Sequence, residues 1–167
     1  MTYLDGAYRR HRPEDMANCT ELAVSAFPEL ADRIECFGAD WLGRQFATDQ
    51  GRIVRGLPQV LMLEPGTGEA LEIPVDLATF HDKELAQQAD AAAAYSFFQQ
   101  WLEAGGPRPD YHQCVGYKRP LYLGGVDEVM NLELVDFEVY WTISAQFLER
   151  VRCLPAGTRI ENIWIED

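Results

Sequence analysis

The sequence contains no long hydrophobic run. Its longest uninterrupted apolar stretch, Val60–Leu63, is far shorter than the roughly 20 residues that a helix needs to cross a bilayer. The N-terminal segment has arginines but no apolar stretch after them, so we expect no signal peptide and a cytoplasmic location. The 167 residues are 47% hydrophobic, which excludes a disordered chain and favours one folded domain with its own core.

Cysteine and histidine are scarce and scattered. No CxxC pair occurs, and no two histidines have the spacing of zinc ligands on one element. In a reducing compartment, free thiols are the expected state of such cysteines. We therefore expect no disulfide framework, no metal and no cofactor. The residues concerned are Cys19, Cys36, Cys114, Cys153, His11, His81 and His112.

Basic residues are few relative to acidic ones. The chain has 14 Lys and Arg against 27 Asp and Glu, which gives a formal net charge of −13. Residues 57–110 hold nine of the acids and only two bases, Lys83 and Arg108, a net of −7. Such a surface repels the phosphates of nucleic acids and attracts a basic protein partner, although acidity can also serve solubility alone.

Apolar periodicity and turn signals predict an α+β fold with a mainly antiparallel sheet packed with two principal helices. The first is expected near 84–103, where apolar residues recur every four positions until Gly105. The second is expected at 136–151, with Asp136 as its N-cap. A shorter helix is expected at Pro13–Phe27.

The clearest hairpin consists of Gln59–Leu63 and Glu69–Val75, joined by a turn that contains proline and two glycines. In its second strand, Leu71, Ile73 and Val75 alternate with other residues and predict one buried face. Further strands are expected within Ile34–Val54, with a turn at Asp49–Gly51, and at Pro120–Leu123 and Arg159–Ile165.

The best catalytic constellation in the sequence is Cys114 with His112, supported by Asp110 or His81. A Cys–His pair needs the thiolate within hydrogen-bond reach of the imidazole and an oxyanion donor nearby. No helix N-terminus or glycine elbow flanks this pair to supply them. We therefore expect no catalytic site and no enzymatic activity, with a Cys–His thiol hydrolase as the weaker alternative.

Three segments of the sequence share the pattern of one protein family. The longest is Cys114–Trp141, with its Tyr-Lys-Arg segment and its Gly-Gly turn. The others are Phe37–Ala47 and Met62–Glu69, followed by the aromatic pairs Phe80-His81 and Phe97-Phe98 and by Trp101-Leu102. Together they resemble the C-terminal domain of Tdi-type immunity proteins of the bacterial type VI secretion system, with SUKH-like immunity proteins as relatives.

The resemblance implies an immunity protein that neutralises a cognate secreted toxin, typically a nuclease, by stoichiometric binding. It also implies an α+β fold, with the SUKH-like immunity fold as a candidate. We expect a single domain over 1–167, with an N-terminal helical extension at 1–33 and the immunity-like domain at 34–165. The signature residues expected to be structural are Gly116, Tyr117, Pro120, Gly124, Gly125, Asn131, Asp136, Tyr140 and Trp141.

We expect the partner to be a toxin with a basic surface, and the acidic middle of the chain to face it. Exposed charges of this kind mainly raise the association rate. An adaptor of SUKH type without a toxin partner is the alternative within the same class of binding proteins. The residues expected on the toxin-facing surface are Glu64, Glu69, Glu72, Asp82 and Glu84.

Overall fold

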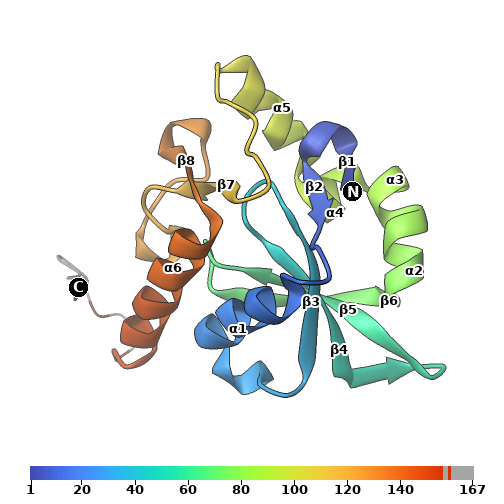
Figure 1. Ribbon diagram of the computed structural model, residues 1–167. Coiled ribbons are helices and arrows are strands. Elements are labelled where there is room, and N and C mark those ends of the chain that lie inside the picture. The colour runs from blue at the N-terminus through green and yellow to red at the C-terminus, as the bar shows by residue number, and fades with distance from the viewer. Residues whose placement is uncertain (156–157, 159–167) are drawn as a thin grey trace.

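The computed structural model describes residues 1–155 and 158, so the strand predicted at Arg159–Ile165 lies outside the described residues. The described part is an α+β structure of antiparallel strands and surrounding helices (Figure 1). The strands are β1 (Thr2–Tyr3), β2 (Tyr8–Arg10), β3 (Ile34–Asp40), β4 (Gln45–Val54), β5 (Leu57–Glu64), β6 (Glu69–Asp76), β7 (Gln113–Tyr117) and β8 (Leu132–Asp136). The α-helices are α1 (Met16–Ala26), α2 (Leu77–Thr79), α3 (Leu85–Gln87), α4 (Ala89–Ala93), α5 (Tyr95–Glu103) and α6 (Phe137–Arg152).

Shorter helical turns connect these elements. The 3-10 helices are η1 (Leu4–Gly6), η2 (Pro28–Leu30), η4 (Leu121–Leu123) and η5 (Val129–Asn131), and η3 (Phe80–Glu84) is a π-helix between α2 and α3. Among the described helices, none is both long enough and apolar enough to cross a membrane.

The main sheet has six strands in the order β1-β2-β3-β4-β5-β6, and every neighbouring pair is antiparallel. Strands β1 and β6 are therefore its two edges. Strands β7 and β8 form a separate antiparallel pair. The predicted fold class, α+β with a mainly antiparallel sheet, is confirmed, although β1, β2, β7 and β8 were not predicted.

Helices cover both faces of the main sheet, which explains the uninterrupted apolar run Val60–Leu63 in β5. Val60 and Met62 pack with Phe80 and Leu85 of the segment after β6. Leu61 and Leu63 point to the other face and pack in the cluster that contains α1 and α6. Successive strand residues alternate between faces, so a strand covered on both sides needs apolar residues at every position.

The predicted hairpin of Gln59–Leu63 and Glu69–Val75 is confirmed by the pairing of β5 with β6. Its expected buried face is only partly correct, because Ile73 and Val75 are half-buried whereas Leu71 is 40% exposed on the edge strand. The turn predicted at Asp49–Gly51 is wrong. That segment lies inside β4, where the register shifts, and the chain reverses at Arg55 and Gly56, both with positive φ.

The helix predicted at 136–151 is confirmed as α6, and the Asp136 carboxylate caps it by accepting a hydrogen bond from the Val139 amide. The helix predicted at 84–103 is wrong as a single element. It is divided into α3, α4 and α5, and Ala94 between the last two has a left-handed backbone with φ 47°. The helix predicted at Pro13–Phe27 begins only at Met16.

The signature segment contains one further wrong prediction. Pro120–Leu123 was expected to be a strand, but residues 121–123 form the 3-10 helix η4, which ends at Gly124. The helix η4 belongs to the loop that connects β7 to β8, and these two strands pair with each other. Helix α6 follows β8 directly and packs beside α1 and β7 (Figure 1).

Candidate interaction surface

The five acidic residues predicted to face a partner do not form one compact cluster. Glu64 and Glu69 are paired at the closed end of the β5–β6 hairpin, and Glu72 lies farther along β6. Asp82 and Glu84 lie in η3, beyond the opposite end of that strand. Since β6 spans about 23 Å at the usual rise per residue, the structure separates the hairpin pair from the η3 pair.

The five acids also differ in exposure. Glu69, Glu72 and Asp82 are exposed, whereas Glu64 and Glu84 are half-buried. Burial raises the pKa of the Glu64 carboxyl, while the nearby Arg44 acts in the opposite direction. Glu64 is therefore a half-buried carboxyl near Arg44 rather than a freely exposed charge.

An apolar groove lies next to the η3 acids and was not predicted. It has a volume of about 480 Å³, and most of its exposed surface is apolar. The lining residues include Leu57, Pro58, Leu77 and Ala78, together with Arg10, Thr48 and His81. Asp76 and Asp82 contribute carboxylates to the same lining. The sequence offered one signal that was missed. Large apolar residues occur at the end of the β4–β5 hairpin, where they are not buried in the core. These residues are Ile53, Val54 and Leu57, each about half exposed, and Leu57 lines the groove.

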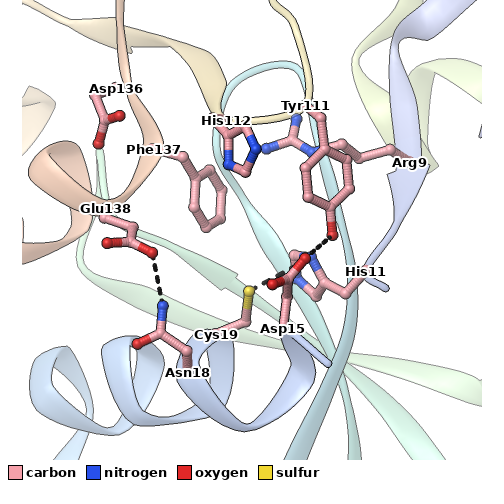
Figure 2. A pocket seen from close by; sticks show the side chains of 10 residues that line it. All are labelled: Arg9, His11, Asp15, Asn18, Cys19, Tyr111, His112, Asp136, Phe137 and Glu138. Carbon is pink, nitrogen blue, oxygen red and sulfur yellow. Dashed lines mark hydrogen bonds between the residues drawn. The ribbon is translucent and has the colours of Figure 1, made fainter. Parts of the chain in front are cut away.

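The Cys–His pair does not form a catalytic arrangement. Cys114 is fully buried in the cluster that contains α1 and α6, and burial raises the pKa of its thiol far above the usual range. His112 is exposed and lines a pocket between α1 and the start of α6 (Figure 2). No hydrogen bond joins the two side chains within the described structure. A thiol held in its neutral form away from solvent is a poor nucleophile.

The two proposed supporting residues have other partners. The Asp110 carboxylate accepts a hydrogen bond from the backbone amide of His112, which stabilises the local turn. The His81 ring lies between the Tyr8 hydroxyl, 2.9 Å from Nε2, and the Leu77 carbonyl, 3.0 Å from Nδ1. Burial lowers the pKa of His81, so the neutral ring accepts from Tyr8 and donates to Leu77.

The signature residues of the β7–β8 loop make contacts within the chain. The Asn131 side chain accepts from the Arg119 amide and donates to the Arg119 and Val126 carbonyl groups, at 2.9–3.1 Å. A side chain at Gly125 would overlap the Arg119 carbonyl oxygen. Pro120 is buried at the start of η4. Together these contacts fix the loop that carries Tyr117 at its beginning.

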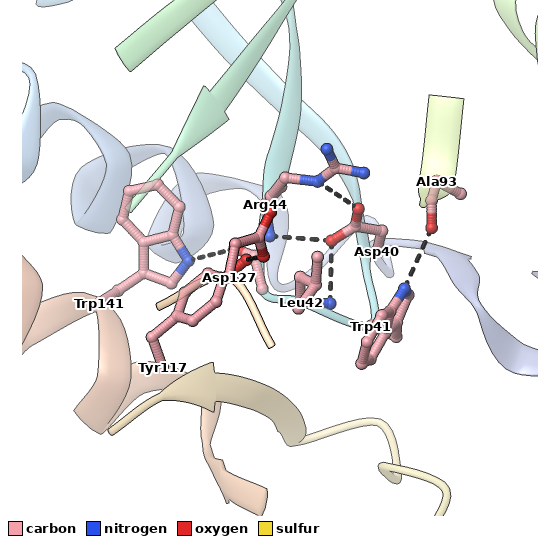
Figure 3. Close-up of polar contacts among 9 residues, drawn as sticks. Asp40, Trp41, Leu42, Arg44, Ala93, Tyr117, Asp127 and Trp141 are labelled. Carbon is pink, nitrogen blue, oxygen red and sulfur yellow. Dashed lines mark hydrogen bonds and ion pairs between the residues drawn. The ribbon is translucent and has the colours of Figure 1, made fainter. Parts of the chain in front are cut away.

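The signature residues around α6 join the two sheets. The Tyr140 hydroxyl accepts from the Tyr117 amide at 3.4 Å, and a side chain at Gly116 would lie only 2.6 Å from the Tyr140 ring. The fully buried Trp141 donates from Nε1 to the Gly43 carbonyl at 2.8 Å (Figure 3). Gly43 belongs to the turn between β3 and β4, so this bond connects α6 to the main sheet.

A buried ion pair organises the same turn and was missed at the sequence level. The Asp40 carboxylate accepts from the Leu42 and Arg44 amides, at 3.1 and 3.0 Å, and from Arg44 Nε at 2.6 Å (Figure 3). Next to it, Trp41 donates from Nε1 to the Ala93 carbonyl at the end of α4. The spacing of four residues between Asp40 and Arg44 is the signal that could have indicated the pair.

Nothing in the described part of the chain assembles a metal centre, since no three His, Cys, Asp or Glu side chains converge there. Three of the four cysteines, Cys19, Cys36 and Cys114, are buried free thiols, and Cys153 is an exposed one. The described surface thus carries an acidic edge and an apolar groove, while most of the signature residues form contacts inside the chain.

The fold is shared with a protein of known structure. The crystal structure of Atu4351 from Agrobacterium tumefaciens is similar to 87% of this chain, with a TM-score of 0.57 and 15% sequence identity. The similar region covers 69% of that protein. At this identity the likeness concerns the fold alone.

A family match is more specific. Residues 77–148 match the family described as T6SS immunity protein Tdi1, C-terminal. This confirms the resemblance to Tdi-type type VI secretion immunity proteins for that part of the chain, which runs from α2 into α6 and contains the signature segment. No curated protein sequence matches the chain.

Proposed function

We propose that this protein is a cytoplasmic immunity protein that binds a cognate type VI secretion toxin and thereby neutralises it without chemistry of its own. The observation that carries the proposal is the match of residues 77–148 to the Tdi1 immunity family. The buried and hydrogen-bonded signature residues Asn131, Tyr140 and Trp141 suit a scaffold role. The inaccessible Cys114 thiol supports a role in binding rather than catalysis.

The surface beside β6 and η3 is the proposed toxin-facing surface. Three of its acids, Glu69, Glu72 and Asp82, are exposed, and the apolar groove at Leu57 and Leu77 lies at one end of it. Interfaces of this type combine charges that accelerate association with a few apolar anchors that slow dissociation. A basic partner, such as a nuclease with a positively charged substrate cleft, fits this combination.

Co-expression with a candidate toxin, such as a secreted nuclease-like protein if one is encoded next to this gene, tests the proposal. We expect the immunity protein to restore growth and to co-purify with the toxin as a stable complex of fixed stoichiometry. The His112→Ala and Cys114→Ser variants should protect as well as the unchanged protein when they are folded. Loss of protection in a folded Cys114→Ser variant would instead support the thiol hydrolase, and absence of any complex would support an adaptor with another partner.

Reversing the exposed acids tests the position of the surface. We expect the triple variant Glu69→Lys, Glu72→Lys and Asp82→Lys to associate with the toxin on the order of 10-fold more slowly at low ionic strength. Its association rate should also depend less on salt, since fewer attractive charges remain to be screened. Stopped-flow or surface-plasmon measurements at several salt concentrations provide both quantities.

The matched control reverses three exposed acids elsewhere and changes the net charge by the same amount. Glu21 on α1, Glu29 in η2 and Glu149 on α6 serve this purpose. If the control triple variant slows association as much as the first one, the effect comes from net charge, and the β6–η3 surface is not the toxin-facing one.

A further inference from the structure

A second pocket lies apart from the β6–η3 surface. It has a volume of about 230 Å³ and is bounded by β2, by the beginning of α1, by the residues before β7 and by the start of α6 (Figure 2). Aromatic and charged side chains line it, and Arg9 contributes the positive charge among them. Its polar, partly enclosed lining differs from the apolar groove at Leu57 and Leu77.

Arg9 is a buried cation that has no hydrogen-bonded counter-ion among the described residues. Its side chain extends from β2 toward the part of the pocket where Tyr111, His112 and Phe137 lie (Figure 2). Arg9 is only 7% exposed, and its guanidinium lies 5.0 Å from the Phe137 ring and 5.6 Å from the Tyr111 ring. Within the described residues the guanidinium makes no hydrogen bond or ion pair, and its Nε is buried without an acceptor.

The two aromatic rings stabilise the guanidinium in part. A buried charge without a hydrogen-bond acceptor is still costly, so such a group is usually paired. Burial lowers the pKa of Arg9, which is the direction expected when the charged form is poorly compensated. The planar guanidinium presents several N–H donors that match the two oxygens of a carboxylate. A carboxylate placed in the pocket would therefore supply what Arg9 lacks.

The other charged residues of the pocket are acids, and the described structure already gives each one internal partner. Asp15 accepts from the Tyr111 hydroxyl at 2.8 Å, and Glu138 accepts from the Asn18 amide at 2.7 Å. In both carboxylates the second oxygen has no hydrogen bond from a described residue. Asp136 caps α6.

The neighbouring His11 ring is uncharged at neutral pH, because burial lowers its pKa to about 4. Its Nε2 lies 3.1 Å from Gln45 Oε1 and its Nδ1 lies 3.5 Å from Cys19 Sγ, so both ring nitrogens are occupied. His11 therefore adds no positive charge to the pocket. Counting Arg, Asp and Glu, the lining carries one positive and three negative charges.

This charge distribution selects among ligands. A phosphate dianion would meet Arg9 but would be repelled by three acids, whereas a ligand with both charges can place each one favourably. We propose that the pocket binds a small amino-carboxylate such as a free α-amino acid, with its carboxylate on Arg9 and its ammonium facing Asp15 and Glu138. The volume equals that of roughly seven or eight liquid water molecules, which suits a small amino acid.

Titration of the full-length protein with glycine, L-alanine, propionate and inorganic phosphate tests this site. Calorimetry gives the affinity, and the Arg9 Nε–H resonance in a nitrogen-15 NMR spectrum reports whether the ligand reaches the guanidinium. We expect glycine or L-alanine to bind and to shift this resonance, propionate to bind more weakly and phosphate not to bind. No shift with either amino acid at 10 mM, or tighter binding of phosphate, would overturn the proposal.

Substitutions separate the site from a general effect. Arg9→Met should weaken L-alanine binding on the order of 10- to 100-fold, as expected for loss of a charged hydrogen-bond pair. Arg12→Met is the matched control, because Arg12 also lies over the Tyr111 ring, at 4.0 Å, but is exposed and does not line the pocket. Equal weakening in the two variants would count against the site.

A second variant keeps the test decisive if Arg9→Met does not fold. Glu138 is exposed, so Glu138→Gln leaves the core intact. It should reduce the preference for L-alanine over propionate, since only L-alanine carries an ammonium group. An unchanged preference would contradict the proposed orientation. Neither measurement involves the toxin, so failure here leaves the proposed immunity function untouched, and the reverse also holds.

Discussion

Replacing Asp40 by asparagine is expected to lower the free energy of unfolding by about 3–5 kcal/mol, the usual cost of breaking a buried ion pair. Asp40 is completely buried, and Arg44 is 10% exposed in its side chain. Asparagine has the same shape, but its amide can direct a donor at Arg44 Nε, where the carboxylate oxygen now accepts at 2.6 Å. Arg44 would then be a buried charge that has lost its hydrogen-bonded counter-ion, with the half-buried Glu64 as a nearby acid. Urea denaturation followed by circular dichroism measures the loss.

Two comparisons identify the cause of that loss. In Asp49→Asn the broken pair is Asp49–Arg33, which has the same 2.6 Å distance, but Arg33 is 40% exposed and water can solvate it, so the loss should be smaller. In the double variant Asp40→Asn with Arg44→Met, the orphaned charge is absent and much of the stability should return. If the double variant is no more stable than Asp40→Asn, the unpaired charge of Arg44 is not the reason.

Trp141→Ala is the second substitution with a large expected effect, a loss of about 3–5 kcal/mol. The indole is fully buried, packs against Phe27 and Phe137, and donates to the Gly43 carbonyl. Its removal leaves a cavity and an unpaired carbonyl between α6 and the main sheet. Since domains are commonly stable by only about 5–15 kcal/mol, the melting temperature should fall by many degrees.

Two variants of α6 provide the controls for this prediction. Trp141→Phe retains an aromatic ring but loses the donor, so it should cost less than Trp141→Ala. Val139→Ala changes a residue of the same helix that is 53% exposed and should stay within about 0.5 kcal/mol of the unchanged protein. A Trp141→Ala loss no larger than that of Val139→Ala would show that α6 does not depend on this contact.

The sequence predicted the elements whose signals are local. Helix α6 was found because Asp136 is a good N-cap, and the β5–β6 hairpin because proline and glycine mark its turn. The break at Ala94 could not be predicted, since alanine is the best helix former. It depends on distant or non-helical contacts: Trp41 donates to the Ala93 carbonyl, and the Asp90 carboxylate accepts from the Ser96 amide.

The candidate surfaces could be predicted from the sequence only in part. Acidic composition pointed to residues 57–110, but it could not show that Glu64 turns inward whereas Glu69 is exposed, because that depends on how the hairpin packs against β7 and α6. The pocket around Arg9 combines residues about 100 positions apart, such as Arg9 and Tyr111. An arginine in a short N-terminal segment gives no sequence signal of burial. That Arg9 is buried without a hydrogen-bonded acid can therefore be recognised only in the structure.

The edge position of β6 has a consequence for self-association. An open strand edge offers unpaired backbone groups to any other strand, including that of a second copy of the chain. On β6, Pro74 removes one donor, and the exposed Glu69 and Glu72 would place like charges against those of an incoming copy. The acids proposed to attract a basic toxin therefore also discourage edge-to-edge aggregation while that toxin is absent.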